Sequence, residues 1–221
     1  MALALFDLDN TLLSGDSDYL WGCFLAEQGL VDRDYYEQEN QRFYDEYKDG
    51  SLDIFEFLAF SLKPLADNEP AVLADLQQQF LEQKIRPIMS PASFQLIDKH
   101  KKANDTLAVI TATNSFVTGP IVQAFGIENL LATEPEKINN RYTGKVDGTP
   151  CFQEGKVERL ESWMREHNQN LQDSWFYSDS HNDIPLLKQV DHPVAVDPDE
   201  QLHQLATNLG WPVISLRQTW K

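Results

Sequence analysis

FDLDNTL, at residues 6–12, follows a short apolar run that begins at Ala2. The run is short and leads straight into carboxylates, which predicts a buried central strand that delivers Asp7 at its carboxyl end. In an open α/β sheet, this is the end at which ligands bind. Asp7 and Asp9 would point to opposite sides of a continuing strand, but both can face one pocket where the strand breaks into a loop. This stretch therefore predicts an α/β fold with two carboxylates at the functional edge of its sheet.

Three later stretches bear on what such a carboxylate pair could do. Two close carboxylates repel each other and invite a divalent cation, although Asp and Asn can equally form a turn by bonding to nearby backbone groups. The later residues are a threonine that ends an apolar segment, a lysine that opens a helical pattern and two acids that follow a strand-like segment: Thr111, Lys156, Asp179 and Asp183. Singly, these fit an ordinary strand-end threonine, a solvated lysine and loop-capping acids. Because each lies at a predicted strand end or helix start, together they favour a Mg²⁺-dependent phosphoryl site.

In order and spacing, these residues resemble the four signature motifs of the haloacid dehalogenase superfamily, and above all its phosphoserine phosphatase-like branch, subfamily IB. The resemblance covers nearly the whole chain. It implies a Rossmann-like, doubly wound parallel sheet with an all-helical C1-type cap. It also implies a phosphoric monoester hydrolase in which Asp7 is the nucleophile that forms an aspartyl-phosphate. Asp9 would serve as the general acid and then as the base for the incoming water.

The same resemblance implies a magnesium site. One Mg²⁺ would be held by the Asp7 side chain, the Asp9 backbone carbonyl and Asp179, with waters completing an octahedron. Asp183 would support the metal-bound waters and orient Lys156. The cofactor that we expect is therefore Mg²⁺, bound by oxygen ligands alone.

Three further residues are expected to hold the phosphate. Thr111 would contribute a hydroxyl and Lys156 a point charge, and Asn182 matches a position at which the family binds phosphate. His181 stands between the two late acids, where the family commonly has a small residue. We expect His181 to face solvent or to support its neighbours rather than to bind a metal.

A long helical stretch separates the first strand from the rest of the sheet. Apolar residues recur at helical spacing through residues 16–85, and prolines divide the stretch into several helices. From Ser90 onward strand and helix alternate, which is typical of a parallel sheet covered on both faces. We expect an α/β core formed by residues 1–15 and 86–221, with a helical cap formed by residues 16–85. Within the core, residues 141–149 are expected to form a small hairpin with its turn at Asp147-Gly148.

Composition and net charge limit the kinds of partner that we expect for this protein. The 221 residues include 18 Lys and Arg against 35 Asp and Glu, a formal net charge of −17. Binding a polyanion requires clustered cations, so neither DNA nor RNA is expected as a partner. The chain shows no signal-peptide pattern and no run long enough to cross a membrane, so we expect a cytoplasmic protein, either monomer or homodimer. Cys23 and Cys151 are expected to be reduced thiols.

The expected cap points to the substrate. A lid over the phosphate site selects a small phosphorylated metabolite rather than a phosphoprotein. In the resembled branch, an acid nine residues after the nucleophile contacts the substrate amine; Asp16 has that position, and it could equally be a helix N-cap. Between Asp16 and Lys84 there are 16 acidic and five basic residues, of which Arg42 is the plausible partner for a substrate carboxylate. An amine-bearing substrate without a carboxylate, such as histidinol phosphate in amino-acid biosynthesis, suits this lid, and phosphoserine is the alternative.

A third hypothesis is a non-enzymatic phospho-receiver module. Receivers also place acids, a threonine and a lysine on a doubly wound sheet. In receivers, however, the acidic pair precedes the acceptor aspartate and the domain is smaller. Here Asp7 comes first, Asp9 follows it and a large helical segment intervenes, which favours the enzyme.

Overall fold

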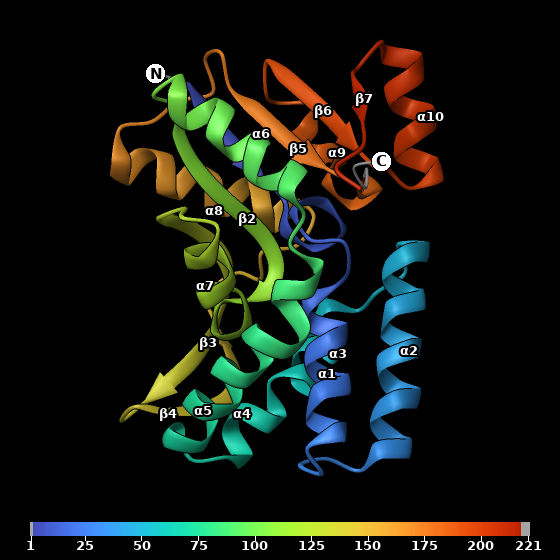
Figure 1. Cartoon of the computed structure of the whole chain (residues 1–221), viewed down its shortest axis with the longest axis vertical. Coiled ribbons are helices and arrows are strands. Elements are labelled where there is room, and N and C mark those ends of the chain that lie inside the picture. Colours follow the sequence, from blue (N-terminus) through green and yellow to red (C-terminus); the bar gives the residue numbers. More distant parts are fainter. Residues whose placement is uncertain (1, 218–221) are drawn as a thin grey trace.

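The computed structural model describes residues 2–217, and its centre is a seven-stranded sheet (Figure 1). The strands are β1 (Leu3–Phe6), β2 (Thr106–Asn114), β3 (Asn129–Ile138), β4 (Arg141–Asp147), β5 (Trp175–Ser178), β6 (His192–Val196) and β7 (Val213–Ile214). Their order across the sheet is β4-β3-β2-β1-β5-β6-β7. Neighbouring strands are parallel except for β3 and β4. The FDLDNTL stretch therefore begins on the central strand, as the sequence predicts.

Helices cover both faces of this sheet. Ala4 and Phe6 of β1 belong to an apolar cluster with α6 (Pro91–Lys102) and α7 (Ser115–Ala124). Leu3 and Leu5 point to the opposite face, because side chains alternate along a strand. There they belong to a second cluster, shared with α8 (Glu154–His167), α9 (Ile184–Leu187) and α10 (Glu200–Leu209). The predicted doubly wound α/β fold is confirmed.

The segment between β1 and β2 is helical, and its helices lie together at one end of the molecule in Figure 1. They are α1 (Ser17–Glu27), α2 (Arg33–Asp49), α3 (Ile54–Ser61), α4 (Lys63–Asp67) and α5 (Pro70–Phe80). The apolar cluster that contains Phe6 continues without a break into Trp21 of α1 and Phe80 of α5. The division at residues 15/16 and 85/86 therefore stays a prediction.

The β3–β4 hairpin turns at a different place from the one predicted. Ile138 pairs with Arg141, so the loop is Asn139-Asn140, and both residues have positive φ, at 51° and 62°. A two-residue loop of this kind is a type I′ turn, which Asn tolerates. Asp147 is instead the last residue of β4, so the predicted turn at Asp147-Gly148 is wrong. Figure 1 shows the hairpin extending beside α4 and α5.

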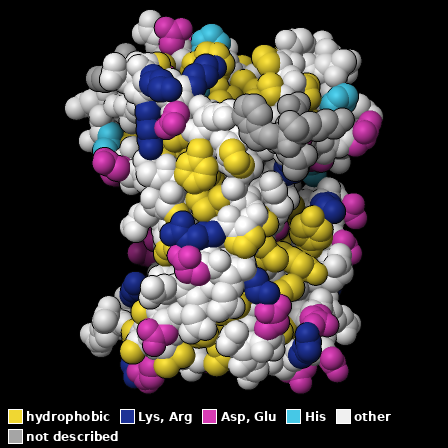
Figure 2. All heavy atoms as spheres, in the orientation of Figure 1, with side chains coloured by type: hydrophobic (Ala, Val, Ile, Leu, Met, Phe, Trp, Pro, Cys, Tyr) yellow, Lys and Arg dark blue, Asp and Glu magenta, His cyan; other side chains and the backbone are white. Residues whose placement is uncertain are grey.

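Surface charge on the face seen in Figure 2 is mixed. The main group of basic side chains lies over α6, whose last turn carries Lys99, Lys101 and Lys102, where cations complement the helix dipole. Elsewhere on this face, Lys and Arg side chains stand singly, beside Asp or Glu. None of the helices within residues 2–217 is both long and apolar enough to span a bilayer. Cys23 and Cys151 are free thiols, the second of them buried.

Candidate active site

The predicted acids and the lysine meet at the carboxyl ends of the central strands. Asp7 follows β1 directly, Thr111 lies near the end of β2, and Asp179 and Asp183 follow β5. These three strands are neighbours in the sheet. After Asp7 the chain leaves the sheet as a tight loop over Leu8–Leu12, in which the Leu13 N–H donates to the Leu8 carbonyl at 2.9 Å.

Lys156 is buried among carboxylates rather than solvated. Its Nζ lies 2.7 Å from Asp7 Oδ1 and 2.7 Å from Asp183 Oδ1, and the side chain of Asp183 also accepts from Ser178 Oγ at 2.6 Å. Burial alone would lower the pKa of Lys156, but Asp183 and Asp7 together raise it well above its usual range. This lysine therefore stays charged at the floor of the site.

A glycine allows α8 to deliver Lys156 to this position. A Cβ on Gly155 would lie 2.1 Å from the backbone oxygen of Pro150, so no other residue fits without moving the backbone. This close approach lets the first turn of α8 pack against the preceding loop.

Asp7 is only 4% exposed. Burial raises its pKa to about 7, with further contributions from the neighbouring Asp183 and Asp9, while Lys156 acts in the opposite direction. The backbone N–H of Asp7 donates to the Tyr177 carbonyl at 2.9 Å, which continues the pairing of β1 with β5. The carboxylate is thus fixed at the sheet edge and held beside an ammonium group.

Thr11 ties Asp179 to the loop that follows Asp7. The Thr11 hydroxyl donates to Asp179 Oδ1 at 3.1 Å, and the Asp179 backbone N–H donates to the same hydroxyl oxygen at 3.0 Å. Burial raises the pKa of Asp179 well above its usual range, and repulsion by Asp7 and Asp183 adds to this. Thr11 belongs to the FDLDNTL motif, but its role in joining the two loops becomes visible only in the fold.

This excess of buried negative charge suits a divalent cation. Asp7, Asp179 and Asp183 lie together with the ammonium of Lys156, so the carboxylates are not neutralised by it alone. Within residues 2–217, no three His, Cys, Asp or Glu side chains form a ready-made metal cage. The expected ligand set would therefore depend on the Asp9 backbone carbonyl and on waters, which Mg²⁺ commonly retains.

Asp9 lies on the side of the loop that faces a cavity. Its Oδ1 accepts from the Ser17 backbone N–H at 2.6 Å, and its Oδ2 accepts from the Thr113 hydroxyl at 2.8 Å. Burial and the nearby Asp16 raise its pKa to about 7, against the effect of the two hydrogen bonds. Sequence reasoning missed Thr113 and Ser17, which orient this carboxyl group.

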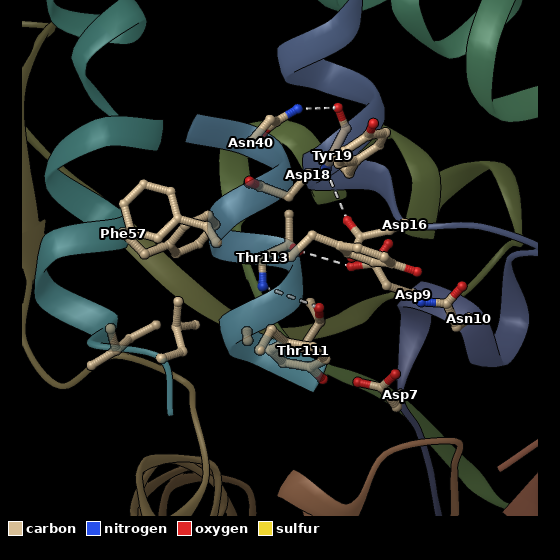
Figure 3. Close-up of a pocket in the computed structure, with 16 residues that line it drawn as sticks. Asp7, Asp9, Asn10, Asp16, Asp18, Tyr19, Asn40, Phe57, Thr111 and Thr113 are labelled. Atoms are coloured by element: carbon tan, nitrogen blue, oxygen red, sulfur yellow. Dashed lines mark hydrogen bonds between the residues drawn. The ribbon is translucent and has the colours of Figure 1, made fainter. Parts of the chain in front are cut away.

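A cavity lies between these residues and the helices above them (Figure 3). Sixteen residues line it. They include four carboxylates (Asp7, Asp9, Asp16 and Asp18) and five aromatic rings (Tyr19, Phe43, Tyr44, Tyr47 and Phe57), but none of these sixteen is Lys, Arg or His. Asp16 also caps α1, since it accepts from the Tyr19 backbone N–H at 2.9 Å. The cavity is therefore strongly acidic and walled by aromatic side chains.

Arg42 does not contribute to this cavity. Its guanidinium donates to Glu39, Glu46 and Glu56, each at 2.8 Å. It lines a separate hollow between the helices. The expectation that Arg42 binds substrate is corrected accordingly, because neighbouring acids on α2 and α3 occupy its donors.

Asn182 and His181 lie where the core meets α2. The Asn182 amide donates to the Tyr47 carbonyl at 3.1 Å and accepts from Gln153 Nε2 at 2.9 Å. The His181 ring contacts Asp199 at 2.8 Å, and a Cβ added to Gly50 would lie 2.9 Å from its Nε2. Both side chains therefore join the helical segment to the sheet, and a phosphate contact by Asn182 stays a prediction.

Comparisons with known proteins find relatives along nearly the whole chain. The profile of the haloacid dehalogenase-like hydrolases matches residues 4–188. A histidinol-phosphatase of Neisseria meningitidis is 44% identical over 97% of this chain and 99% of its own length. A phosphoserine phosphatase of Mycobacterium tuberculosis is 28% identical, with 98% of this chain and 71% of that protein covered.

Solved structures give the same fold. A crystal structure of a protein of unknown function from Bordetella pertussis has a TM-score of 0.92 and 43% identity, covering 97% of this chain and 98% of that one. A phosphoserine phosphatase solved as an analogue of its phospho-aspartyl intermediate has a TM-score of 0.72 over 98% of this chain and 94% of that one. At 19% identity, the second likeness concerns the fold alone.

Proposed function

The chain belongs to the haloacid dehalogenase-like hydrolases, as a phosphoric monoester hydrolase, and on that premise we propose that it is a Mg²⁺-dependent histidinol-phosphatase of the cytoplasm. The observation that carries the choice of substrate is the cavity beside Asp7, which four carboxylates and five aromatic rings line without a Lys, Arg or His among the lining residues. Histidinol phosphate offers such a cavity an ammonium group and an imidazole ring, and it has no carboxylate. Family membership also favours a turning-over enzyme over a receiver module.

In the first proposed step, a carboxylate oxygen of Asp7 attacks phosphorus and the ester P–O bond breaks. The Asp9 carboxyl gives its proton to the departing alkoxide, so histidinol leaves as a neutral alcohol. The pKa of Asp9, raised to about 7 by burial, keeps a protonated fraction available near neutral pH. Thr113 and the Ser17 backbone N–H would orient the carboxyl for this transfer.

In the second step, water attacks the phosphorus of the aspartyl-phosphate. Asp9, now a carboxylate, takes a proton from that water, and the bond between phosphorus and the Asp7 oxygen breaks. Inorganic phosphate and the original Asp7 carboxylate result. The net reaction consumes one water and leaves both acids as they began.

Lys156 and Thr111 are proposed to hold the phosphoryl oxygens. Lys156 already lies 2.7 Å from Asp7 Oδ1, so its ammonium is next to the site of attack. Thr111 Oγ1 accepts a hydrogen bond from the Thr113 backbone N–H at 3.2 Å. This bond uses a lone pair of the hydroxyl oxygen, so the hydroxyl proton stays available for a ligand. A bound Mg²⁺, held by Asp7, the Asp9 carbonyl and Asp179 with Asp183 in support, would supply neutralisation of the phosphoryl charge.

The alternative substrate is phosphoserine, the substrate class in the name of a 28% identical relative. Its carboxylate would have to enter a cavity lined by acids, where an unpaired charge is costly. Arg42, the residue expected to meet it, is engaged by three glutamates. These contacts favour histidinol phosphate.

We expect kcat/KM with Mg²⁺ to be at least about 100-fold higher for histidinol phosphate than for phosphoserine, because no Lys, Arg or His among the lining residues would pair with the added carboxylate. Steady-state release of inorganic phosphate measures both values. Phosphoethanolamine, which keeps the amine but lacks the carboxylate, is the control for the effect of that group. A preference for phosphoserine would reject the proposed substrate.

Replacing Asp9 by Asn should slow the first step for an alkyl ester such as histidinol phosphate but not for p-nitrophenyl phosphate. Single-turnover release of histidinol should slow by about 10²–10⁴-fold, because the alkoxide leaves without a proton. With p-nitrophenyl phosphate the variant should still release one equivalent of p-nitrophenolate in a burst, since this leaving group needs no acid. Turnover then stalls at the aspartyl-phosphate for want of a base. Equal slowing of the burst with both esters would show that Asp9 is not the acid.

A further inference from the structure

One carboxylate in the cavity has no role in the reaction described above. Asp18 lies in the first turn of α1 and is 9% exposed. Its Oδ1 is fully buried and has no hydrogen-bond partner among the described residues. Leaving such an acceptor unsatisfied costs free energy, so a protein that keeps it commonly gains something when a ligand arrives.

The surroundings of Asp18 disfavour a negative charge on its side chain. Burial raises the pKa of Asp18 well above its usual range, and repulsion by Asp16 and Asp9 adds to the shift. The lining residues include no Lys, Arg or His that could pair with it. In Figure 3 the Asp18 side chain points toward the part of the cavity where Phe57 lies. A cation or an N–H donor with a flat apolar body would satisfy both the acid and the rings.

The four carboxylates follow one another along the cavity, away from the nucleophile. Figure 3 shows Asp7, Asp9, Asp16 and Asp18 in this order. The charges that act on Asp18 are consistent with its place at the end of this row, since they come from Asp16 and Asp9 and not from Asp7. Asp18 is thus the acid at the end of the cavity remote from the reacting phosphorus.

Histidinol phosphate carries its polar groups in a matching order. The phosphate ester comes first, the ammonium follows on the second carbon, and the imidazole ring is attached one carbon further on. With phosphorus at Asp7, the ammonium falls toward Asp16 and the ring falls toward Asp18. The aromatic side chains around Asp18 can then cover the faces of the ring.

We propose that Asp18 is the specificity residue that accepts a hydrogen bond from the imidazole N–H of the substrate, within the aromatic end of the cavity. This inference rests on the proposed histidinol-phosphatase function. It assigns Asp18 to binding alone, so the residue should act on KM and leave the chemical step unchanged. It also makes Asp18 a residue that costs stability in the empty protein.

The test compares Asp18→Asn with the wild-type protein on two substrates. For histidinol phosphate we expect kcat/KM to fall by about 10- to 100-fold, mostly through KM, since a hydrogen bond to a charged group is lost. For phosphoethanolamine, which has the ammonium but no ring, we expect a change of less than about twofold. Urea unfolding should show Asp18→Asn to be at least as stable as the wild type, because burial and the neighbouring acids oppose ionisation of the carboxyl group, and the amide has no charged form to disfavour.

Two further variants serve as comparisons. Asp34→Asn removes a charge from an exposed position on α2 and should leave kcat/KM unchanged for both substrates. Asp16→Asn retains the capping oxygen of α1. It should weaken the binding of both substrates, because both carry the ammonium group. Together, these two variants distinguish the loss of a contact with the imidazole ring from a general effect of removing negative charge.

The outcomes distinguish the two claims. If the wild-type protein hydrolyses histidinol phosphate but Asp18→Asn affects both substrates equally, or neither, the role of Asp18 is overturned and the function stands. If the wild-type protein does not hydrolyse histidinol phosphate, the proposed function fails and this inference fails with it. A loss confined to the substrate with the ring, with stability retained, supports both.

Discussion

Replacing Asp7 by Asn is expected to abolish turnover of histidinol phosphate, with kcat falling by about 10⁴-fold or more. The amide has nearly the volume of the carboxylate but lacks the charge that attacks phosphorus. Stability should not fall at pH 7.5, because the carboxylate is buried and burial has already raised its pKa to about 7. Phosphate release measures the activity, and urea unfolding measures the stability.

Asp98→Asn is a matched control, since it makes the same change at an exposed position on α6. It should leave both quantities unchanged. Intact-mass measurement during turnover adds a direct readout, because the wild-type protein should gain one phosphoryl group and Asp7→Asn should gain none. More than about a tenth of wild-type activity in Asp7→Asn would contradict its assignment as nucleophile.

Replacing Lys156 by Met is expected to damage both activity and stability. Activity should fall by about 10²–10³-fold, because a donor to the phosphoryl oxygens is lost. The free energy of unfolding at pH 8 should fall by about 3–5 kcal/mol, since Asp7 and Asp183 remain buried without their ammonium partner. Urea unfolding in the absence of metal measures the second effect.

The stability loss should depend on pH in a definite direction. Lys156 is the neighbour that lowers the pKa of Asp7, so its removal moves that pKa further above the unfolded value. A group whose folded pKa is raised binds protons more readily in the folded state, so stability is gained as pH falls. The deficit of Lys156→Met relative to wild type should therefore shrink between pH 8 and pH 6.

Two comparisons make this result specific. Lys102→Met, at an exposed position on α6, should cost little at either pH. The double variant Lys156→Met with Asp7→Asn should recover part of the lost stability at pH 8, because one of the unpaired charges is gone. A deficit that is the same at both pH values and in the double variant would point to lost packing instead.

The sequence was sufficient for the fold class and for the convergence of the main polar groups. Ala2–Phe6 is uniformly apolar, and such a short run is typical of a strand that is covered on both faces. Polar residues at the carboxyl ends of parallel strands must meet at one edge of the sheet. The positions of Asp7, Thr111 and Asp179 in this pattern therefore predict that they meet, as the family resemblance also implies.

The local sequence did not show which of two possible turns closes the hairpin, or which side chains Arg42 contacts. Asn139-Asn140 and Asp147-Gly148 both suit a tight hairpin turn, and the pairing of β3 with β4 selects the first. Arg42 was chosen because the helical segment has few basic residues, yet acids one turn away and on α3 occupy it. Both errors have one physical cause: the deciding contact involves residues whose proximity the local pattern does not specify.

What the amino-acid sequence determined by itself was the order of strands and helices, the acids at the strand ends and the resulting phosphatase chemistry. Only the tertiary structure decided which side chains orient those acids and which acids line the cavity. Thr113 reaches Asp9 across 104 positions of the chain, and Asp18 is buried in the cavity wall beside residues of α2 and α3. Such neighbours are set by how helices pack over the sheet, and packing depends on the shapes of many side chains at once.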